Sequence, residues 1–228
     1  MKSTFPLLLS FNGGYVDTAG YLALQGLFTA HVTGNFVTLG ATLVHGTSGA
    51  IAKVVALPVF CIVVVATRVA SLRLPSVGLP VLKTMILLKI VLLAIGAAFA
   101  VAWGPFSDGD DWRAIVTGMT LVAAMAIQNA AHRIHLPKAP PTTLMTGTST
   151  QMMIDVADLF GAKAPAKERN EAKARLAKMS VTVAAFAAGC LVAAIMYAAF
   201  DVRVFYAPPL IALLAFLAIH WDADPGIF

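Results

Sequence analysis

The stretch over residues 11–45 limits the fold of this chain more than any other part of the sequence. It is apolar enough for a lipid bilayer, yet glycines and polar side chains interrupt it repeatedly. As one straight helix it would measure about 50 Å, well beyond a hydrocarbon core of roughly 30 Å. Two full spans of about 20 residues each would not fit into it. We therefore predict a helix that breaks within residues 30–35, followed by a shorter helix that starts at Thr33 or Gly34.

A helix break inside a bilayer has a functional meaning. It frees backbone N–H and C=O groups, which are tolerated only where protein or a watery cavity satisfies them. Interrupted helices of this kind hold the substrates of many transporters. The break therefore indicates a polar site within the membrane.

The composition supports a membrane environment. Of the 228 residues 59% are hydrophobic and only 12% are charged, with a mean hydropathy of +0.84. A soluble domain has roughly twice that share of charged residues. We predict an all-α polytopic membrane protein whose surroundings are the lipid bilayer. The net charge of +5 fits Lys and Arg in cytoplasmic loops and does not indicate nucleic acid. Cys61 and Cys190 lie in apolar runs and are expected to be small buried residues, not a disulfide or a metal pair.

The apolar runs predict about six transmembrane helices. After the broken first segment they cover roughly residues 50–72, 81–103, 112–131, 179–200 and 205–221. The connections over residues 68–83 and 132–178 are basic, whereas the 104–111 loop has three aspartates and no basic residue. Since Lys and Arg concentrate in cytoplasmic loops, we place both basic regions and both termini in the cytoplasm.

The chain contains a weak internal repeat. Thr33-Gly34-Asn35 and Thr146-Gly147-Thr148 stand 113 residues apart, and each follows an apolar run rich in small residues. We predict a first repeat over residues 1–103 and a second over 104–228, with a basic cytoplasmic linker at 161–178. Each repeat has three spans and a half-helix that starts at the Thr-Gly pair. An odd number of spans turns the second repeat upside down, so the two form inverted repeats of the kind found in secondary transporters.

A polar stripe follows each Thr-Gly pair. A stripe on an otherwise apolar helix has to face protein or water, not lipid. If the second Thr-Gly segment is re-entrant, its two aspartates approach the cytoplasmic mouth and pair with the basic linker. The stripes consist of Thr38, Thr42 and His45 in the first repeat and Gln151, Asp155 and Asp158 in the second.

The run GYVDTAGYLALQGLFTAHVTGNFVTLG, residues 14–40, closely resembles the signature of the YoaK-like family of bacterial inner-membrane proteins. The second Thr-Gly segment, with Gln-Asn-Ala at 128–130 before it, is similar to the second motif of that family. The resemblance covers nearly the whole chain. It implies a small multi-spanning protein of the bacterial inner membrane, and it carries over no substrate and no catalytic residues.

The two Thr-Gly starts form the predicted binding site. A helix that begins inside the membrane directs unpaired N–H groups and the positive end of its dipole at whatever lies ahead. Two such starts from opposed repeats would bind a small polar or anionic solute. The alternative is a pair of small-residue packing motifs where helices cross. The predicted substrate-binding residues are Asp17, His31, Thr33, Gly34, Asn35, Gln128, Asn129, Thr146, Gly147 and Thr148.

Five polar residues lie within or near the spans. Four of them have both a functional and a structural interpretation, and the fifth has only a structural one. Asp17 is either an intramembrane proton or cation site or an acid that complements a helix dipole. His31 either carries a coupling proton or satisfies the carbonyls freed by the break. Gln128 and Asn129 are either substrate ligands or interhelical hydrogen-bonding partners. Lys89 is expected to extend to the cytoplasmic headgroups.

We therefore predict a secondary transporter or channel for a small polar or anionic solute, with any coupling through Asp17 or His31. One alternative is a non-transporting membrane scaffold or lipid-binding protein. The other is an intramembrane enzyme that uses Asp17, His31 or Asp155. The sequence has no Walker loop, dinucleotide-binding glycine motif, HExxH or GxSxG, so we expect no cofactor, no metal and no catalytic residues. The small size is compatible with a homo-oligomer.

Overall fold

The computed structural model describes residues 4–143, 145–160 and 165–221, in which every regular element is a helix. The prediction of an all-helical protein is confirmed. Four stretches of the described chain are long and apolar enough to cross a membrane: Ala50–Ser76, Val81–Trp103, Trp112–His135 and Ala166–Ile219. The last stretch contains two helices with a short 3-10 helix between them.

The helices fall into two series of similar order. The first series is α1 (Thr4–Ala23), the 3-10 helix η1 (Val32–Gly34), α2 (Asn35–His45), α3 (Ala50–Arg73), the 3-10 helix η2 (Leu74–Val77) and α4 (Val81–Trp103). The second series is α5 (Trp112–His135), α6 (Met145–Phe160), α7 (Ala166–Phe200), the 3-10 helix η3 (Asp201–Tyr206) and α8 (Ala207–Trp221). In each series a long helix is followed by a short one and then by two more long ones.

The predicted break after α1 is present, but it begins earlier than expected. The helix ends at Ala23, and the chain is then irregular until η1 begins at Val32. Gln25 and Gly26 have φ angles of 53° and 82°, and the N–H of Gly26 donates to the carbonyl of Tyr21 at 2.9 Å. Glycine adopts this left-handed conformation readily, so the pair terminates the helix. The second helix starts within one turn of the predicted position.

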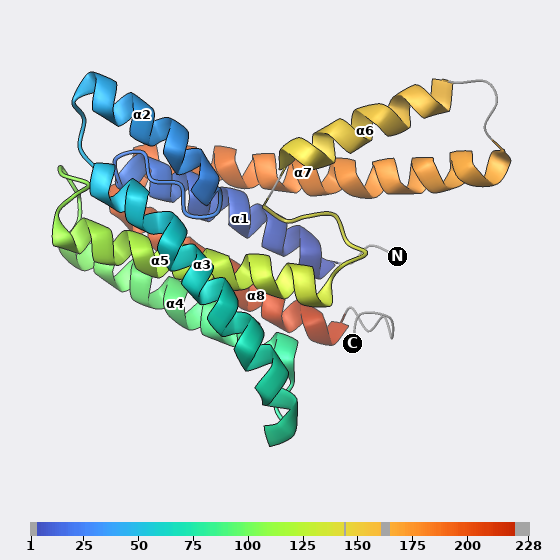
Figure 1. Cartoon of the computed structure of the whole chain (residues 1–228), viewed down its shortest axis with the longest axis horizontal. Helices are drawn as coiled ribbons and strands as arrows, with labels where there is room; N and C mark the ends of the chain where they lie inside the picture. The colour runs from blue at the N-terminus through green and yellow to red at the C-terminus, as the bar shows by residue number, and fades with distance from the viewer. Residues whose placement is uncertain (1–3, 144, 161–164, 222–228) are drawn as a thin grey trace.

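The long helices pack in pairs that cross the two series (Figure 1). Helix α1 packs against α7 and α8, α5 packs against α3 and α4, and α4 also contacts α8. The short helices each lie on one long helix, α2 on α3 and α6 on α7. The α1–α7 crossing is close, because a Cβ on Gly14 would lie 2.2 Å from the carbonyl oxygen of Phe186. A Cβ on Gly189 would lie 2.0 Å from that of Phe11. Small residues at such crossings let helix backbones touch, as is usual in membranes.

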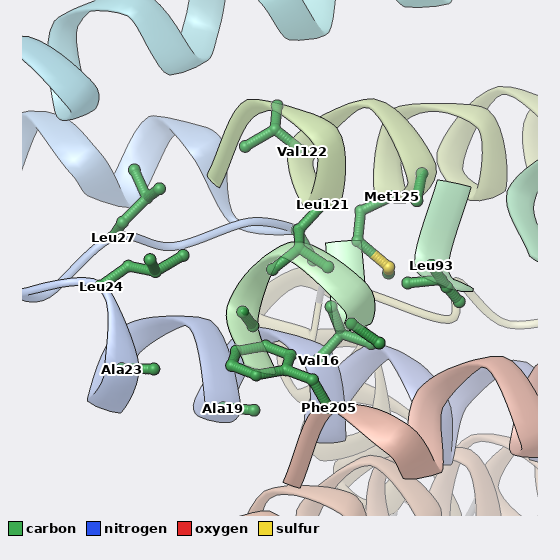
Figure 2. Close-up of a cluster of buried hydrophobic side chains, with 14 of the residues drawn as sticks. Val16, Ala19, Ala23, Leu24, Leu27, Leu93, Leu121, Val122, Met125 and Phe205 are labelled. Carbon is green, nitrogen blue, oxygen red and sulfur yellow. The ribbon is translucent and has the colours of Figure 1, made fainter. Parts of the chain in front are cut away.

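A buried apolar cluster fixes the chain where it leaves α1. Figure 2 shows Leu24 and Leu27, from the irregular segment, in one apolar cluster with Val16 and Ala19 of α1 and Leu121 of α5. Leu24 and Leu27 are each only 1% exposed. The segment after α1 is therefore a packed part of the core and not a free loop.

The acidic loop between α4 and α5 holds one end of the bundle together. The carboxylate of Asp110 accepts hydrogen bonds from the N–H groups of residues 49–52, at 2.8–3.2 Å, and so caps the start of α3. The Gln25 side chain donates to the carbonyl of Phe106 at 2.9 Å. The C-terminal ends of α1 and α2 therefore lie at the same end of the molecule (Figure 1). Between residues 24 and 31 the chain therefore runs back from this end toward the middle of the molecule. Helix α2 then leads to the same end again.

Candidate functional site

Asp17 holds the segment that leads into α2. Its carboxylate accepts hydrogen bonds from the N–H groups of Thr29 at 2.8 Å and Ala30 at 2.7 Å. The second carboxylate oxygen lies 2.6 Å from Nδ1 of His31. Asp17 is only 4% exposed and is the fourteenth residue of α1, so it does not complement the dipole at the start of that helix. Instead it satisfies backbone N–H groups that the helix break leaves free.

His31 lies where three elements meet. Its ring pairs with Asp17 of α1 and packs edge-on against Phe186 of α7, with ring centroids 5.6 Å apart. Its carbonyl accepts the N–H of Gly34 at 2.8 Å. The side chain is 29% exposed, whereas its carboxylate partner is 5% exposed. The imidazole is therefore the open side of this buried acid–imidazole pair.

Asn35 clamps the irregular segment to the start of α2. Its Oδ1 accepts the N–H of Phe28 and its Nδ2 donates to the carbonyl of Phe28, both at 2.8 Å. The side chain is 1% exposed. A Cβ on Gly34 would lie 3.1 Å from the Phe28 ring, so this glycine lets the ring pack closely. Thr33 beside it is exposed. We call residues 28–35 the first helix start.

The start of α6 is more open. Thr146 and Gly147 are exposed, and a Cβ on Gly147 would meet nothing within 4 Å. The open face of α6 carries Thr146, Ser149 and Thr150 near its beginning and Met153 farther along. Thr148 is 4% exposed on the opposite face. Within the described residues, Gly147 therefore packs against no other segment, whereas Gly34 packs against the Phe28 ring. We call residues 142–143 and 145–148 the second helix start.

Gln128 and Asn129 hold the segment before α6, as Asp17 holds the segment before α2. Gln128 is fully buried, and its Nε2 donates to the carbonyl of Leu9 at 3.0 Å and to the hydroxyl of Thr142 at 3.1 Å. The Asn129 side chain donates to its own helix at Met125 and accepts the Thr143 hydroxyl at 2.5 Å. Gln128 thus joins α5 to α1 and to the second helix start.

The expected position of Lys89 is wrong. The side chain is fully buried instead of extending to the headgroups, and its Nζ donates to Oε1 of Gln128 at 2.5 Å. Lys89 lies six residues after Lys83 in α4, roughly 9 Å farther along the helix. At that depth its amine faces α5 and not the membrane surface. The spacing from Lys83 was the sequence signal for this depth.

Asp155 ties α6 to α7. It is fully buried, and Nε of Arg175 donates to its carboxylate at 2.8 Å, with Gln151 donating from one turn earlier at 2.9 Å. The predicted pairing of this aspartate with the basic linker is confirmed. The α6 residue Leu159 also accepts from Arg169, so the two helices run antiparallel.

This pairing places the two helix starts at a similar height along α7. The Asp155–Arg175 contact fixes one common level of the two antiparallel helices, and both rise 1.5 Å per residue. Met145, ten residues before Asp155, therefore lies roughly level with the residue ten places after Arg175. That position adjoins Phe186, the residue in contact with His31. In Figure 1, α2 and α6 lie on the same side of the molecule and their N-terminal ends point toward each other over α7.

The two polar clusters are also neighbours along α1. A Cβ on Gly13 would lie 3.4 Å from Nε2 of Gln128, and Gly13 precedes Asp17 by one helical turn. The clusters around Gln128 and Asp17 therefore contact successive turns of α1, roughly 6 Å apart along its axis. All the predicted substrate-binding residues belong to one of the two helix starts or to the side chains that hold them.

Comparison with known proteins identifies a family but no characterised relative. The family described as "Protein of unknown function (DUF1275)" matches residues 5–219, nearly the whole chain. The resemblance to YoaK-like proteins is consistent with this match. No curated protein and no solved structure matches the chain.

Proposed function

This chain belongs to the DUF1275 family, and we propose that it is a secondary transporter or channel of the bacterial inner membrane for a small polar or anionic solute. The observation that carries this proposal is the pair of short helices whose starts lie at a similar height along α7 and which run out to opposite ends. Each begins at a Thr-Gly pair with an exposed threonine, Thr33 or Thr146. Helix N-termini inside a membrane offer N–H groups and positive dipole ends to such a solute.

The contacts between helices support the predicted inverted repeat. Exchanging α1 to α4 for α5 to α8 reproduces the same set of packing pairs, including α2 on α3 for α6 on α7. The polar contacts follow the same exchange. Thr42 of α2 accepts from Lys53 of α3 at 2.9 Å, and Asp155, 113 residues later, accepts from Arg175 of α7. A two-fold relation between the halves accounts for both patterns.

Six spans follow if the 20-residue α1 is counted and α7 and α8 are counted separately. Twenty residues rise about 30 Å, enough for the hydrocarbon core. The spans are then α1, α3, α4, α5, α7 and α8, with α2 and α6 as re-entrant half-helices. The basic first part of α7, which contains Arg175, would extend into the cytoplasm together with both termini.

A transport role agrees better with the geometry than an enzymatic one. Asp17 and His31 do meet, as a catalytic pair would require. However, Asp17 is buried, and its Oδ1 already accepts from the N–H groups of both Thr29 and Ala30. Asp155, the third residue of the enzymatic alternative, pairs with Arg175 instead. The acid–imidazole pair is thus better suited to hold the first helix start, and to exchange a proton through His31, than to activate a nucleophile.

Solute flux through proteoliposomes tests the proposal. The probes are formate, nitrate and urea, and the readout is the rate of volume recovery after an osmotic step. We expect the protein to accelerate recovery for at least one probe, and Gly147→Leu to reduce that acceleration at least tenfold by filling the open start of α6. Gly40→Leu is the matched control, because Gly40 is also an exposed helical glycine with nothing within 4 Å of its Cβ position. No acceleration for any probe, or equal effects of the two substitutions, would contradict the proposal.

A further inference from the structure

Lys89 is a basic group buried in the middle of the apolar helix α4, and in the described part of the chain its amine has one hydrogen-bond acceptor. Its side chain is fully buried in α4, and Oε1 of Gln128 is the hydrogen-bond acceptor for its amine. A lysine ammonium has three N–H donors to satisfy. No ion pair joins Lys89 to a carboxylate in the part of the chain that the structure describes. A buried ammonium without a counter-ion is strongly disfavoured, so this arrangement suits the neutral amine.

The charged groups on the neighbouring elements either form hydrogen bonds with other residues or lie toward the ends of the bundle. Asp17 of α1 is held by His31 and by two backbone N–H groups. On η3, Asp201 and Arg203 lie next to the C-terminal end of α4, where Gly104 approaches Val202.

Apart from Arg113 in the first turn of α5, the remaining charged and histidine residues on these helices lie toward the opposite end. On α5, His132, Arg133 and His135 lie in the last turn, and His132, four residues after Gln128, is the nearest of them along the helix. Lys83 lies in the first turn of α4, and α8 carries His220 next to its last residue. Of these, only His132 stands within one turn of Gln128, so a test must separate its titration from that of Lys89.

Gln128 connects Lys89 to the second helix start. While its Oε1 accepts from Lys89, its Nε2 donates to Thr142, which is 1% exposed, and to the carbonyl of Leu9. A protonated Lys89 needs further acceptors, and its amine has no hydrogen bond to the Thr142 hydroxyl or the Leu9 carbonyl, the two oxygens that Gln128 contacts. Protonation therefore requires this network to rearrange, and Thr142 moves with the segment that leads into α6.

We propose that Lys89 is an intramembrane proton-binding site whose protonation shifts the second helix start through Gln128. The ligand is a proton, taken up by the neutral amine and released from the ammonium. Lys89, although it belongs to α4 of the first half, thus gives the second helix start an ionisable group, as the Asp17–His31 pair does for the first. The proton site itself does not depend on the solute; only its meaning as a coupling site rests on the proposed transport function.

Hydrogen exchange of the full-length protein in phosphatidylethanolamine–phosphatidylglycerol nanodiscs tests this proposal without any solute. The readout is backbone amide exchange over residues 136–143 between pH 5.5 and 9.5, corrected for the intrinsic rate. We expect the wild type to change between two exchange levels by at least fivefold. Lys89→Met, which imitates the neutral amine, should remain at the high-pH level throughout. Lys83→Met is the matched control in the same helix and should keep the wild-type transition, as should His132→Gln.

A second variant keeps the test decisive if Lys89→Met does not fold. Gln128→Glu gives Lys89 a carboxylate partner in place of the amide, which should hold it charged and fix the exchange near the low-pH level. A wild type without a transition, or a transition that persists in Lys89→Met or moves with His132→Gln, would overturn the proposal. Because flux through the Gly147 site is measured separately, the transport proposal can fail while the proton site stands, and the reverse.

Discussion

At the first helix start a charged group holds the chain, whereas at the second neutral amides do so. Asp17 binds two backbone N–H groups and an imidazole, and Asn35 binds both backbone groups of Phe28. At the second start, Gln128 and Asn129 reach only the hydroxyl groups of Thr142 and Thr143. Hydrogen bonds to charged groups are worth roughly twice as much as neutral ones. The first start is therefore held more firmly than the second.

The largest effect on the stability of either helix start is expected from Asp17→Asn. The substitution keeps the shape but places an NH₂ group where a carboxylate oxygen accepted hydrogen bonds. Losing the charge-assisted hydrogen bonds to Thr29, Ala30 and His31 should cost the first helix start about 3 kcal/mol. This corresponds to roughly 100-fold faster amide exchange at Thr29 and Ala30.

The matched control is Asp111→Asn, which alters an exposed aspartate that caps α5 through the N–H of Arg113. It should leave exchange at Thr29 and Ala30 unchanged. If Asp17→Asn also left it unchanged, the first helix start would not depend on the charge, and the contrast between the two starts would disappear.

A smaller effect is expected from Thr143→Val at the second helix start. It removes the single neutral hydrogen bond to Asn129, worth about 1 kcal/mol. Exchange around residue 143 should therefore increase roughly fivefold. Thr150→Val is the control, because that hydroxyl bonds within its own helix, to the carbonyl of Thr146. An effect of Thr143→Val as large as that of Asp17→Asn would show that the two starts are held equally firmly.

The smallest effects are expected from alanine at the two Thr-Gly glycines, and they should have opposite signs. A Cβ on Gly147 meets nothing within 4 Å, so Gly147→Ala should stabilise α6 by about 0.5–1 kcal/mol through helix propensity. At Gly34 the new Cβ would press on Phe28 at 3.1 Å, so the net result should be a loss of stability of roughly 0.5 kcal/mol. Thermal unfolding midpoints in detergent would separate the two variants. A lower midpoint for Gly147→Ala would mean that the start of α6 is not open in the way described.

Much of the fold is readable from local sequence patterns, since apolar runs and breaks are local properties. The short helices after the Thr-Gly pairs and the link between Asp155 and the basic linker follow from spacing and charge alone. The early end of α1 could not be read, because Gln25 takes a left-handed conformation in a run that otherwise continues the apolar pattern. What fixes it is the burial of Leu24 and Leu27 against distant helices.

The candidate site was predictable in its members but not in its contacts. Asp17 and His31 were singled out by sequence, yet their pairing depends on the chain turning back after α1. The burial of Lys89 depends on the packing of α4 on α5, which brings Gln128 to its amine from 39 residues away. Contacts over such distances have no local signature.

Thiol accessibility in the membrane tests most directly whether a polar site lies between the two helix starts. Single cysteines at position 33 or 146, Thr33→Cys or Thr146→Cys, are introduced into a background in which Cys61 and Cys190 are alanine. Val37→Cys, on the exposed apolar face of α2, is the comparison. In intact proteoliposomes we expect a water-soluble thiosulfonate to label positions 33 and 146 at least tenfold faster than position 37. Labelling at 33 and 146 as slow as at 37 would place both helix starts against lipid or within dry protein, and would contradict the account.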